Sequence, residues 1–149
     1  MAALHDALAA VTAGIEAAIG DPRVDVASHP GRFTEAELER LILKQRAVRV
    51  GIEQVAELQT QGPGQVRAQI LFAAFVVCGD SLAAPRHQAA LALTDTLLAA
   101  LPYQRWGVSY LTAVLPASLR ADNLYSGEIN ARGVALWALS WQQGFTNTQ

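Results

Sequence analysis

The chain has 149 residues, of which 52% are hydrophobic and 16% are charged, and its formal net charge is −2. A chain of this length is expected to form a single domain, residues 1–149, and to bury about 70% of its unfolded surface without disulfides or metal. The 11 Lys and Arg residues are scattered, which argues against sequence-reading nucleic-acid binding. The high apolar content favours a protein that buries further surface in an assembly.

The first part of the chain predicts one helix and one short strand. Apolar residues recur there at helical spacing: Leu4, Leu8, Val11, Ile15 and Ile19. They predict an amphipathic helix over residues 3–19 that ends at Gly20. No Lys or Arg occurs among the first twenty residues, so a signal peptide is not expected. Residues 23–28 alternate apolar with polar side chains and predict a short, half-buried strand.

A second, shorter helix is predicted over residues 35–43. Thr34 and Glu37 have the spacing of a capping box, in which each side chain bonds a free backbone N–H of the first turn. Glu35, Glu37 and Glu39 resemble an acid/base cluster, but acidic residues at a helix start ordinarily complement the helix dipole.

The chain is organised around residues 65–80, which read QVRAQILFAAFVVCGD. The stretch first alternates and then, from Ile70 to Cys78, becomes apolar on both sides, which is typical of a strand that enters the buried centre of a sheet. It is too short for a membrane span, which needs about 20 apolar residues. Residues 46–58 predict a preceding strand, and residues 60–65 a polar hairpin loop between the two.

The C-terminal half predicts a helix, two strands and a long irregular stretch. The helix follows Pro85 and ends near Leu101. Residues 103–130 are loop-rich with one strand near residues 117–125, residues 131–142 form the last strand, and the polar residues 145–149 are expected to be loose. The apolar face of the helix is predicted from its leucines: Leu91, Leu93, Leu97, Leu98 and Leu101. The expected fold class is α+β (mixed α/β), with a mostly antiparallel sheet of four or five strands flanked by three helices.

The residues that could carry chemistry favour structural roles. The sequence has no phosphate-binding glycine loop, no Gly-x-Ser-x-Gly and no His-Glu-x-x-His motif. His5, His29 and His87 lie far apart without the short spacing of metal ligands. Cys78 lies inside the apolar run, which favours a buried hydrophobe over a reactive thiol. No enzymatic activity, metal or cofactor is therefore expected.

Three further groups have both a structural and a functional interpretation. Arg46, Arg49 and Arg67 form an anion site if they meet across the hairpin, but their alternation favours a solvated edge or a subunit contact. For Trp137 and Trp141, core packing is the favoured interpretation, a subunit interface is the second, and stacking on a ligand is the third. Asp80 and Asp95 are expected to cap the third helix and to lie on the surface, respectively.

The order of these patterns resembles the tail-completion proteins of Mu-like long-tailed phages, which act as tail terminators. The resemblance rests on the helix ending in Ile19-Gly20, the Phe33–Leu38 helix start, the hairpin with its apolar strand, Leu97–Leu101, and the late strand over Gly133–Phe145. It implies a homo-oligomeric ring, commonly a hexamer, on the head-proximal end of the tail tube. The ring stops tube polymerisation and presents the head-joining surface, and the family offers no catalytic residue.

The resemblance also implies partners and a location. The partners are further copies of the chain, the tail tube protein, the head–tail connector protein and, where there is one, the sheath protein. DNA passes through the lumen without specific binding, and there is no membrane contact. The location is the virion tail, assembled in the host bacterial cytoplasm. Alternatives from other classes are a head–tail connector or other tail protein, and a small cytoplasmic enzyme or ligand-binding domain.

Two segments are candidate assembly contacts. The hairpin tip is polar and rich in Gly and Pro, so it can extend and become ordered on binding. The long stretch over residues 103–130 contains residue types favoured at interface anchors, although ordinary surface loops explain both segments as well. The candidate residues are Gln61, Gly62, Pro63, Gly64, Trp106, Tyr110, Arg120 and Tyr125.

Overall fold

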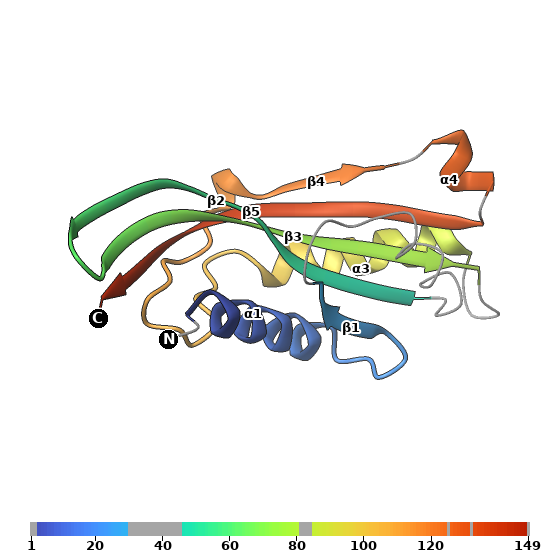
Figure 1. The fold of residues 1–149 in the computed structure, drawn as a ribbon. Helices are drawn as coiled ribbons and strands as arrows, with labels where there is room; N and C mark the ends of the chain where they lie inside the picture. The colour runs from blue at the N-terminus through green and yellow to red at the C-terminus, as the bar shows by residue number, and fades with distance from the viewer. Residues whose placement is uncertain (1–2, 30–45, 81–84, 125, 132, 149) are drawn as a thin grey trace.

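A computed structural model describes residues 3–29, 46–80, 85–124, 126–131 and 133–148 (Figure 1). It shows an α+β fold in which helices pack on one five-stranded sheet. The elements, in chain order, are α1 (Ala3–Ile19), β1 (Asp25–Ser28), β2 (Arg46–Gly62), β3 (Gln65–Gly79), α3 (Arg86–Ala100), a 3-10 turn η1 (Pro116–Ser118), β4 (Arg120–Asn123), α4 (Gly127–Ala131) and β5 (Val134–Thr148).

The strand order in the sheet is β1-β2-β3-β5-β4, so the predicted central strand, β3, is confirmed. β2 and β3 form the predicted antiparallel hairpin, and β5 pairs antiparallel with β3 from Gln65↔Thr148 to Gly79↔Val134. β4 is antiparallel to β5, whereas β1 runs parallel to β2. The sheet is therefore mixed, with antiparallel pairing at its centre.

The two faces of the sheet follow from the alternation of side chains along its strands. On β3, Ile70, Phe72 and Val76 point into the main core, while Val77 points into a smaller cluster on the opposite face. Trp137 and Trp141 of β5 contribute to the main core, as their favoured interpretation predicted. Trp141 is fully buried and stacks on Phe72, with ring centroids 5.7 Å apart.

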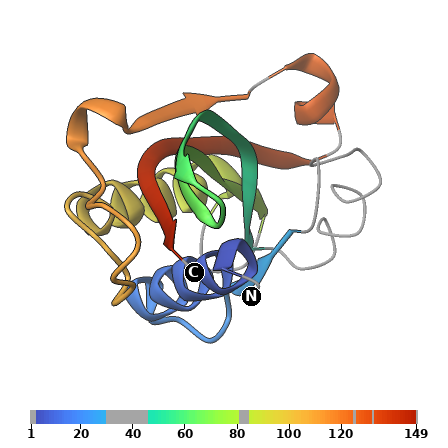
Figure 2. The same cartoon turned by 60° about the vertical axis from the view of Figure 1, so that its left-hand side comes forward.

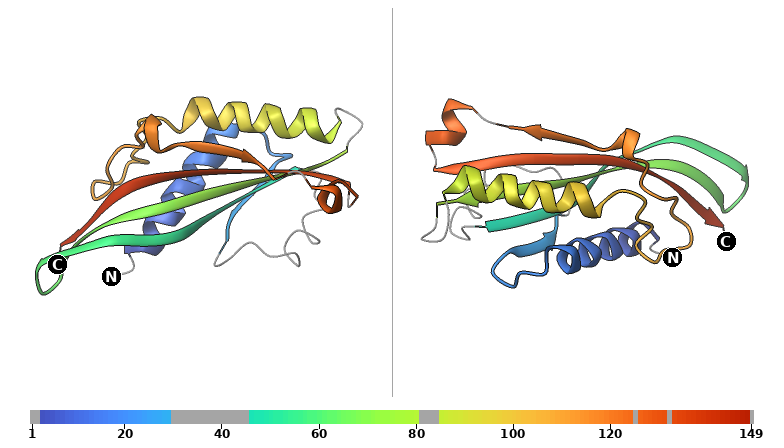
Figure 3. Two further views of the ribbon diagram at one scale, coloured as in Figure 1. Left: turned by 90° about the horizontal axis from the view of Figure 1, so that it is seen from above. Right: turned by 180° about the vertical axis from the view of Figure 1, so that it is seen from behind.

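α1 and α3 both cover the face of the sheet that carries the main core (Figures 2 and 3). α1 ends as predicted at Gly20, which has a φ of 62° and donates its N–H to the carbonyl of Glu16. A left-handed residue at this position is best supplied by glycine. The helix predicted over residues 35–43 lies outside the described residues.

Several predictions about surfaces and boundaries were wrong. Leu4 of α1 and Leu91 and Leu98 of α3 are exposed, because the core sides of these helices use alanines together with Val11, Ile15, Leu93 and Leu97. The polar residues 145–148 are not loose, because β5 continues through them and pairs with β3. A short helix, α4, lies where an irregular stretch was predicted.

Candidate assembly surface

The sheet extends beyond its helices as a three-stranded arm, which we define as residues 55–62 of β2, 65–69 of β3 and 144–148 of β5. Figures 1 and 3 show the arm projecting past the N-terminal end of α1 and past α3. Its strands continue the ladders of the sheet, with Thr60 opposite Val66 and Val66 opposite Asn147. The arm is therefore a fixed extension of the sheet.

The tip of the arm is shorter than predicted. β2 continues to Gly62 and β3 begins at Gln65, so Pro63 and Gly64 alone form the turn, and the loop predicted over residues 60–65 was wrong. Gly64 has a φ of 77°. Proline followed by a glycine with positive φ suits a type II turn, because proline fixes the first central residue and glycine tolerates the second.

β2 is irregular within and just before the arm. Its pairing with β3 shifts between Ile52 and Gln54, between Ala56 and Gln59, and between Thr60 and Gly62. Glu57 lies in the second shift and has a φ of 55°, a left-handed value that is uncommon for a residue other than glycine. Such bulges twist a strand and change the face on which its side chains emerge.

An apolar groove of about 410 Å³ lies between the arm and the first turn of α1. Leu4, Val55 and Leu58 line it and are 38%, 41% and 63% exposed. Its full lining is Ala3, Leu4, His5, Val55, Leu58, Val66, Ala68, Phe145 and Asn147. This groove could not be predicted from the sequence, because Val55 and Leu58 are three residues apart and a regular strand would place them on opposite faces.

The two long edges of the sheet differ in how they are covered. Beyond β4, the outer edge of β5 is covered by residues 110–118: Thr112 N–H donates to the Gly144 carbonyl, Thr146 N–H to the Tyr110 carbonyl, and Gln142 N–H to Ser118 Oγ. On the other side, β1 pairs only with Ala47–Val50 of β2. Among the described residues, no strand pairs with the remaining edge of β2, which is the outer edge of the arm.

Trp106 and Tyr110, two candidate anchors, make contacts within the chain. The hydroxyl of Tyr110 donates to the Ala3 carbonyl at 3.1 Å, and its ring meets Phe145 edge-on. The Trp106 indole lies so close to Gly14 that a Cβ at that position would collide with it. Both side chains are half-buried and hold the segment over residues 103–114 against α1 and β5.

The buried side chain of Gln143 anchors the same segment. Its Oε1 accepts the indole N–H of Trp106 at 2.9 Å and that of Trp141 at 3.1 Å. Its Nε2 donates to the carbonyls of Gln104 at 3.2 Å and Thr112 at 2.7 Å. Gln143 thereby stabilises a segment in which Trp106 itself has a φ of 62°. No sequence pattern predicts this role, since one glutamine in a polar stretch does not differ from its neighbours.

The remaining candidate residues do not gather in one place. Gly62, Pro63 and Gly64 lie at the tip of the arm, whereas Arg120 begins β4 at the far edge of the sheet. The Arg120 side chain is 73% exposed and lies 3.4 Å from Asp122. Gln61 belongs to β2, and Tyr125 lies outside the described residues.

The arginine trio does not form an anion site. Arg46 lies opposite Cys78 and Arg49 opposite Phe75, whereas Arg67 lies near the tip, opposite Gln59, so the disfavoured alternative, in which the three meet, does not hold. Register decides this, because about ten strand residues separate Arg49 from Gln59. Arg49 instead pairs with Asp25 at 2.8 Å.

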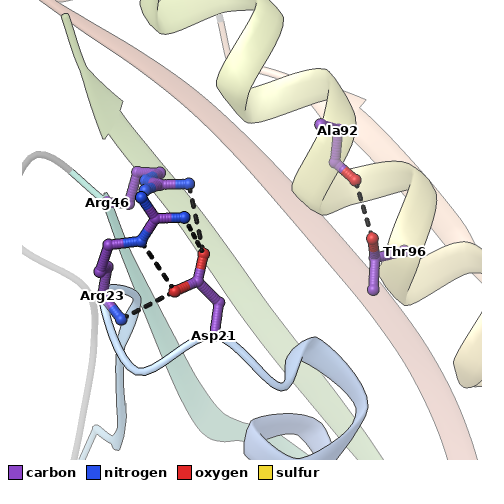
Figure 4. Close-up of polar contacts among 5 residues, drawn as sticks. All are labelled: Asp21, Arg23, Arg46, Ala92 and Thr96. Atoms are coloured by element: carbon purple, nitrogen blue, oxygen red, sulfur yellow. Dashed lines mark hydrogen bonds and ion pairs between the residues drawn. The ribbon is translucent and has the colours of Figure 1, made fainter. Parts of the chain in front are cut away.

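Asp21 joins the end of α1 to the sheet. It accepts two hydrogen bonds from the Arg23 side chain and one from the Arg23 backbone N–H, and Arg46 lies 3.6 Å away. Figure 4 shows both guanidinium groups directed at the Asp21 carboxylate, and Thr96 of α3 bonded to the Ala92 carbonyl. The hydrogen bonds from Arg23 hold the pKa of Asp21 below its ordinary value of 3.8. A groove of about 770 Å³ lies beside this network, and of its charged lining residues Asp21, Arg23 and Asp25 are in ion pairs.

The other titratable groups occupy structural positions. Cys78 is buried, as predicted, and desolvation raises the pKa of its thiol to about 11. Asp80 accepts the backbone N–H of Arg86 at the start of α3, which confirms its predicted capping role, and Asp95 lies on the surface. In the part of the chain that the structure describes, no three His, Cys, Asp or Glu side chains gather as metal ligands would.

Neither a protein-family model nor a curated protein matches the sequence. No helix in the described ranges is both long enough and apolar enough to cross a bilayer.

Proposed function

We propose that the protein is a self-assembling structural protein of the tail-terminator type, which works by association and catalyses no reaction. The observation that carries this proposal is the arm, an extension of the sheet beside exposed Val55 and Leu58 whose β2 edge pairs with no strand among the described residues. An exposed strand edge is a template for pairing with another chain, and an apolar groove beside it gives such pairing specificity. A monomer would gain nothing from leaving this edge open.

In the proposed assembly, copies of the chain form a ring on the head-proximal end of a tail tube. The ring ends tube polymerisation, and its other side meets the head–tail connector. The arm supplies contacts to neighbouring copies or to the tube. The mild net negative charge suits a lumen through which DNA passes without binding.

Light scattering on the size-exclusion peak, with and without purified tail tubes, tests this function. We expect either a ring alone or a monomer that is recruited to tube ends, where electron microscopy would show a cap. A chain that stays monomeric at every concentration and ignores tubes would contradict the proposal. In that case the groove beside Leu4 would be screened for small apolar ligands, in line with the ligand-binding alternative.

A further inference from the structure

We infer that copies of this chain associate head to tail, with the uncovered edge of β2 in one copy pairing with the outer edge of β4 in the next. This inference rests on the proposed self-assembly and adds its contact surface. Among the described residues, no strand lies beyond β1 and the part of β2 past Val50 on one side of the sheet, or beyond β4 on the other side. Figure 1 shows β4 at the upper margin of the molecule.

The strand directions suit this contact. β2 is antiparallel to β3, β3 to β5, and β5 to β4, so β4 is antiparallel to β2 within one copy. Neighbours related by rotation about an axis along the strands would therefore present β4 antiparallel to β2. Antiparallel pairing between two edges needs no crossover and is slightly more stable per residue than parallel pairing.

Charge favours a contact between these two unlike edges. Glu57 is exposed on the β2 edge, in a groove that Arg67 and Gln69 also line. Arg120 begins β4 opposite Ser140, and its exposed side chain lies 3.4 Å from Asp122. Pairing β2 with β2 of a second copy would bring like charges together, whereas pairing β2 with β4 lets Arg120 meet Glu57.

A contact between two different surfaces repeats indefinitely and closes into a ring when the rotation permits. A contact of one edge with itself would end at a dimer. The inferred contact therefore supplies the kind of interface that a ring requires.

Disulfide cross-linking tests the inference, because the only native cysteine, Cys78, is buried with a raised pKa and stays unreactive near neutral pH. In the double variant Glu57→Cys/Arg120→Cys, oxidation should give a ladder of covalent multimers. Each single variant should give none, and an equal mixture of the two should give cross-linked dimers and nothing larger. A Glu57→Cys/Asp95→Cys variant, whose second cysteine lies on α3, is the matched control and should give no ladder.

Charge exchange provides a second measurement that needs no cross-link. Glu57→Arg and Arg120→Glu should each weaken assembly, by up to about fivefold for an exposed pair, and the combined variant should restore it. Cross-linking of Glu57→Cys with itself, or rings of the double variant without a ladder, would overturn the inferred contact and leave self-assembly standing. A wild-type chain that never assembles, alone or on tubes, would overturn both.

Discussion

At the scale of single residues, Gln143 joins parts of the chain that lie far apart in sequence. Its side chain is 1% exposed and bonds to Gln104, Trp106, Thr112 and Trp141. An amide group offers two donors and an acceptor oxygen with two lone pairs, and here all of them are used. These four bonds add to the backbone bonds of Tyr110 and Thr112 that also hold the segment before η1 on β5.

Replacing Gln143 with alanine should lower the free energy of unfolding by about 3 kcal/mol, because buried donors and acceptors that lose their partners cost about 1–3 kcal/mol each and only some regain water. Urea unfolding followed by circular dichroism measures the loss. The neighbouring exposed Gln142 is the matched control, and Gln142→Ala should change the stability by less than about 0.5 kcal/mol. Equal losses in the two variants would show that the network contributes little.

Asp21 gives the chain a stability that depends on pH. Hydrogen bonds from Arg23 lower its pKa in the folded protein below the ordinary 3.8. The stabilisation is therefore complete above about pH 4 and is lost as the pH falls through the folded-state pKa. Asp80, whose pKa is lowered chiefly by the backbone N–H of Arg86, contributes with the same sign.

The variant Asp21→Asn should consequently have a lower Tm than the wild type at neutral pH, and the difference should shrink between about pH 5 and about pH 3. Thermal unfolding across this range measures the effect. Asp95→Asn removes an exposed carboxylate that has no ion pair among the described residues. The difference in Tm between this variant and the wild type should therefore not change with pH. If the difference in Tm between Asp21→Asn and the wild type were the same at every pH in this range, the electrostatic explanation would be refuted.

At the scale of elements, the arm differs from the rest of the sheet because two of its apolar side chains, Val55 and Leu58, are exposed. Leu58, at 63%, and Leu91 of α3, at 54%, are similarly exposed, yet only Leu58 borders both the groove and the uncovered edge. This pairing of similar leucines separates the effect of the assembly surface from that of a general loss of surface hydrophobicity.

Leu58→Lys should weaken self-association or tube binding at least tenfold, because it places a charge in an apolar contact, and should leave monomer stability within about 0.5 kcal/mol of the wild type. Leu91→Lys should leave both properties unchanged. Sedimentation velocity and urea unfolding of the two variants provide the measurements. A loss of assembly in Leu91→Lys and not in Leu58→Lys would place the contact on α3.

The elements that the sequence predicted well are those whose periodicity is regular. The helix over residues 3–19 and the strand over residues 65–80 were placed within a few residues, because helical spacing runs through the first and an uninterrupted apolar run marks the second. The face of α3 was misjudged because leucine occurs on both sides of it, and only packing decides which side is buried. The polar end of β5 was misjudged because its pairing with β3 stabilises a strand that its own residues do not favour.

At the scale of the whole molecule, the fold class followed from element order, whereas the assembly surface did not follow from any local pattern. The groove requires α1 and the arm to be brought together from distant parts of the sequence. The bulge at Glu57 cannot be recognised from the spacing of apolar residues in β2. Gln143 and Gly14 are likewise meaningful only once the Trp106 indole has been placed between β5 and α1. Such contacts are long-range, and spacing along the chain carries no information about them.

The pairing of β3 with β5 has a consequence for how the protein reaches this state. α3, η1, β4 and α4 all lie in sequence between the two strands, and even their nearest paired residues, Gly79 and Val134, are separated by this whole region. The β2–β3 hairpin can form locally, but its central strand then waits with an open edge until β5 arrives. Folding rates fall as such distant contacts dominate. During synthesis, the most apolar strand of the chain would thus be exposed longest, and this interval is when chaperones would matter most to its yield.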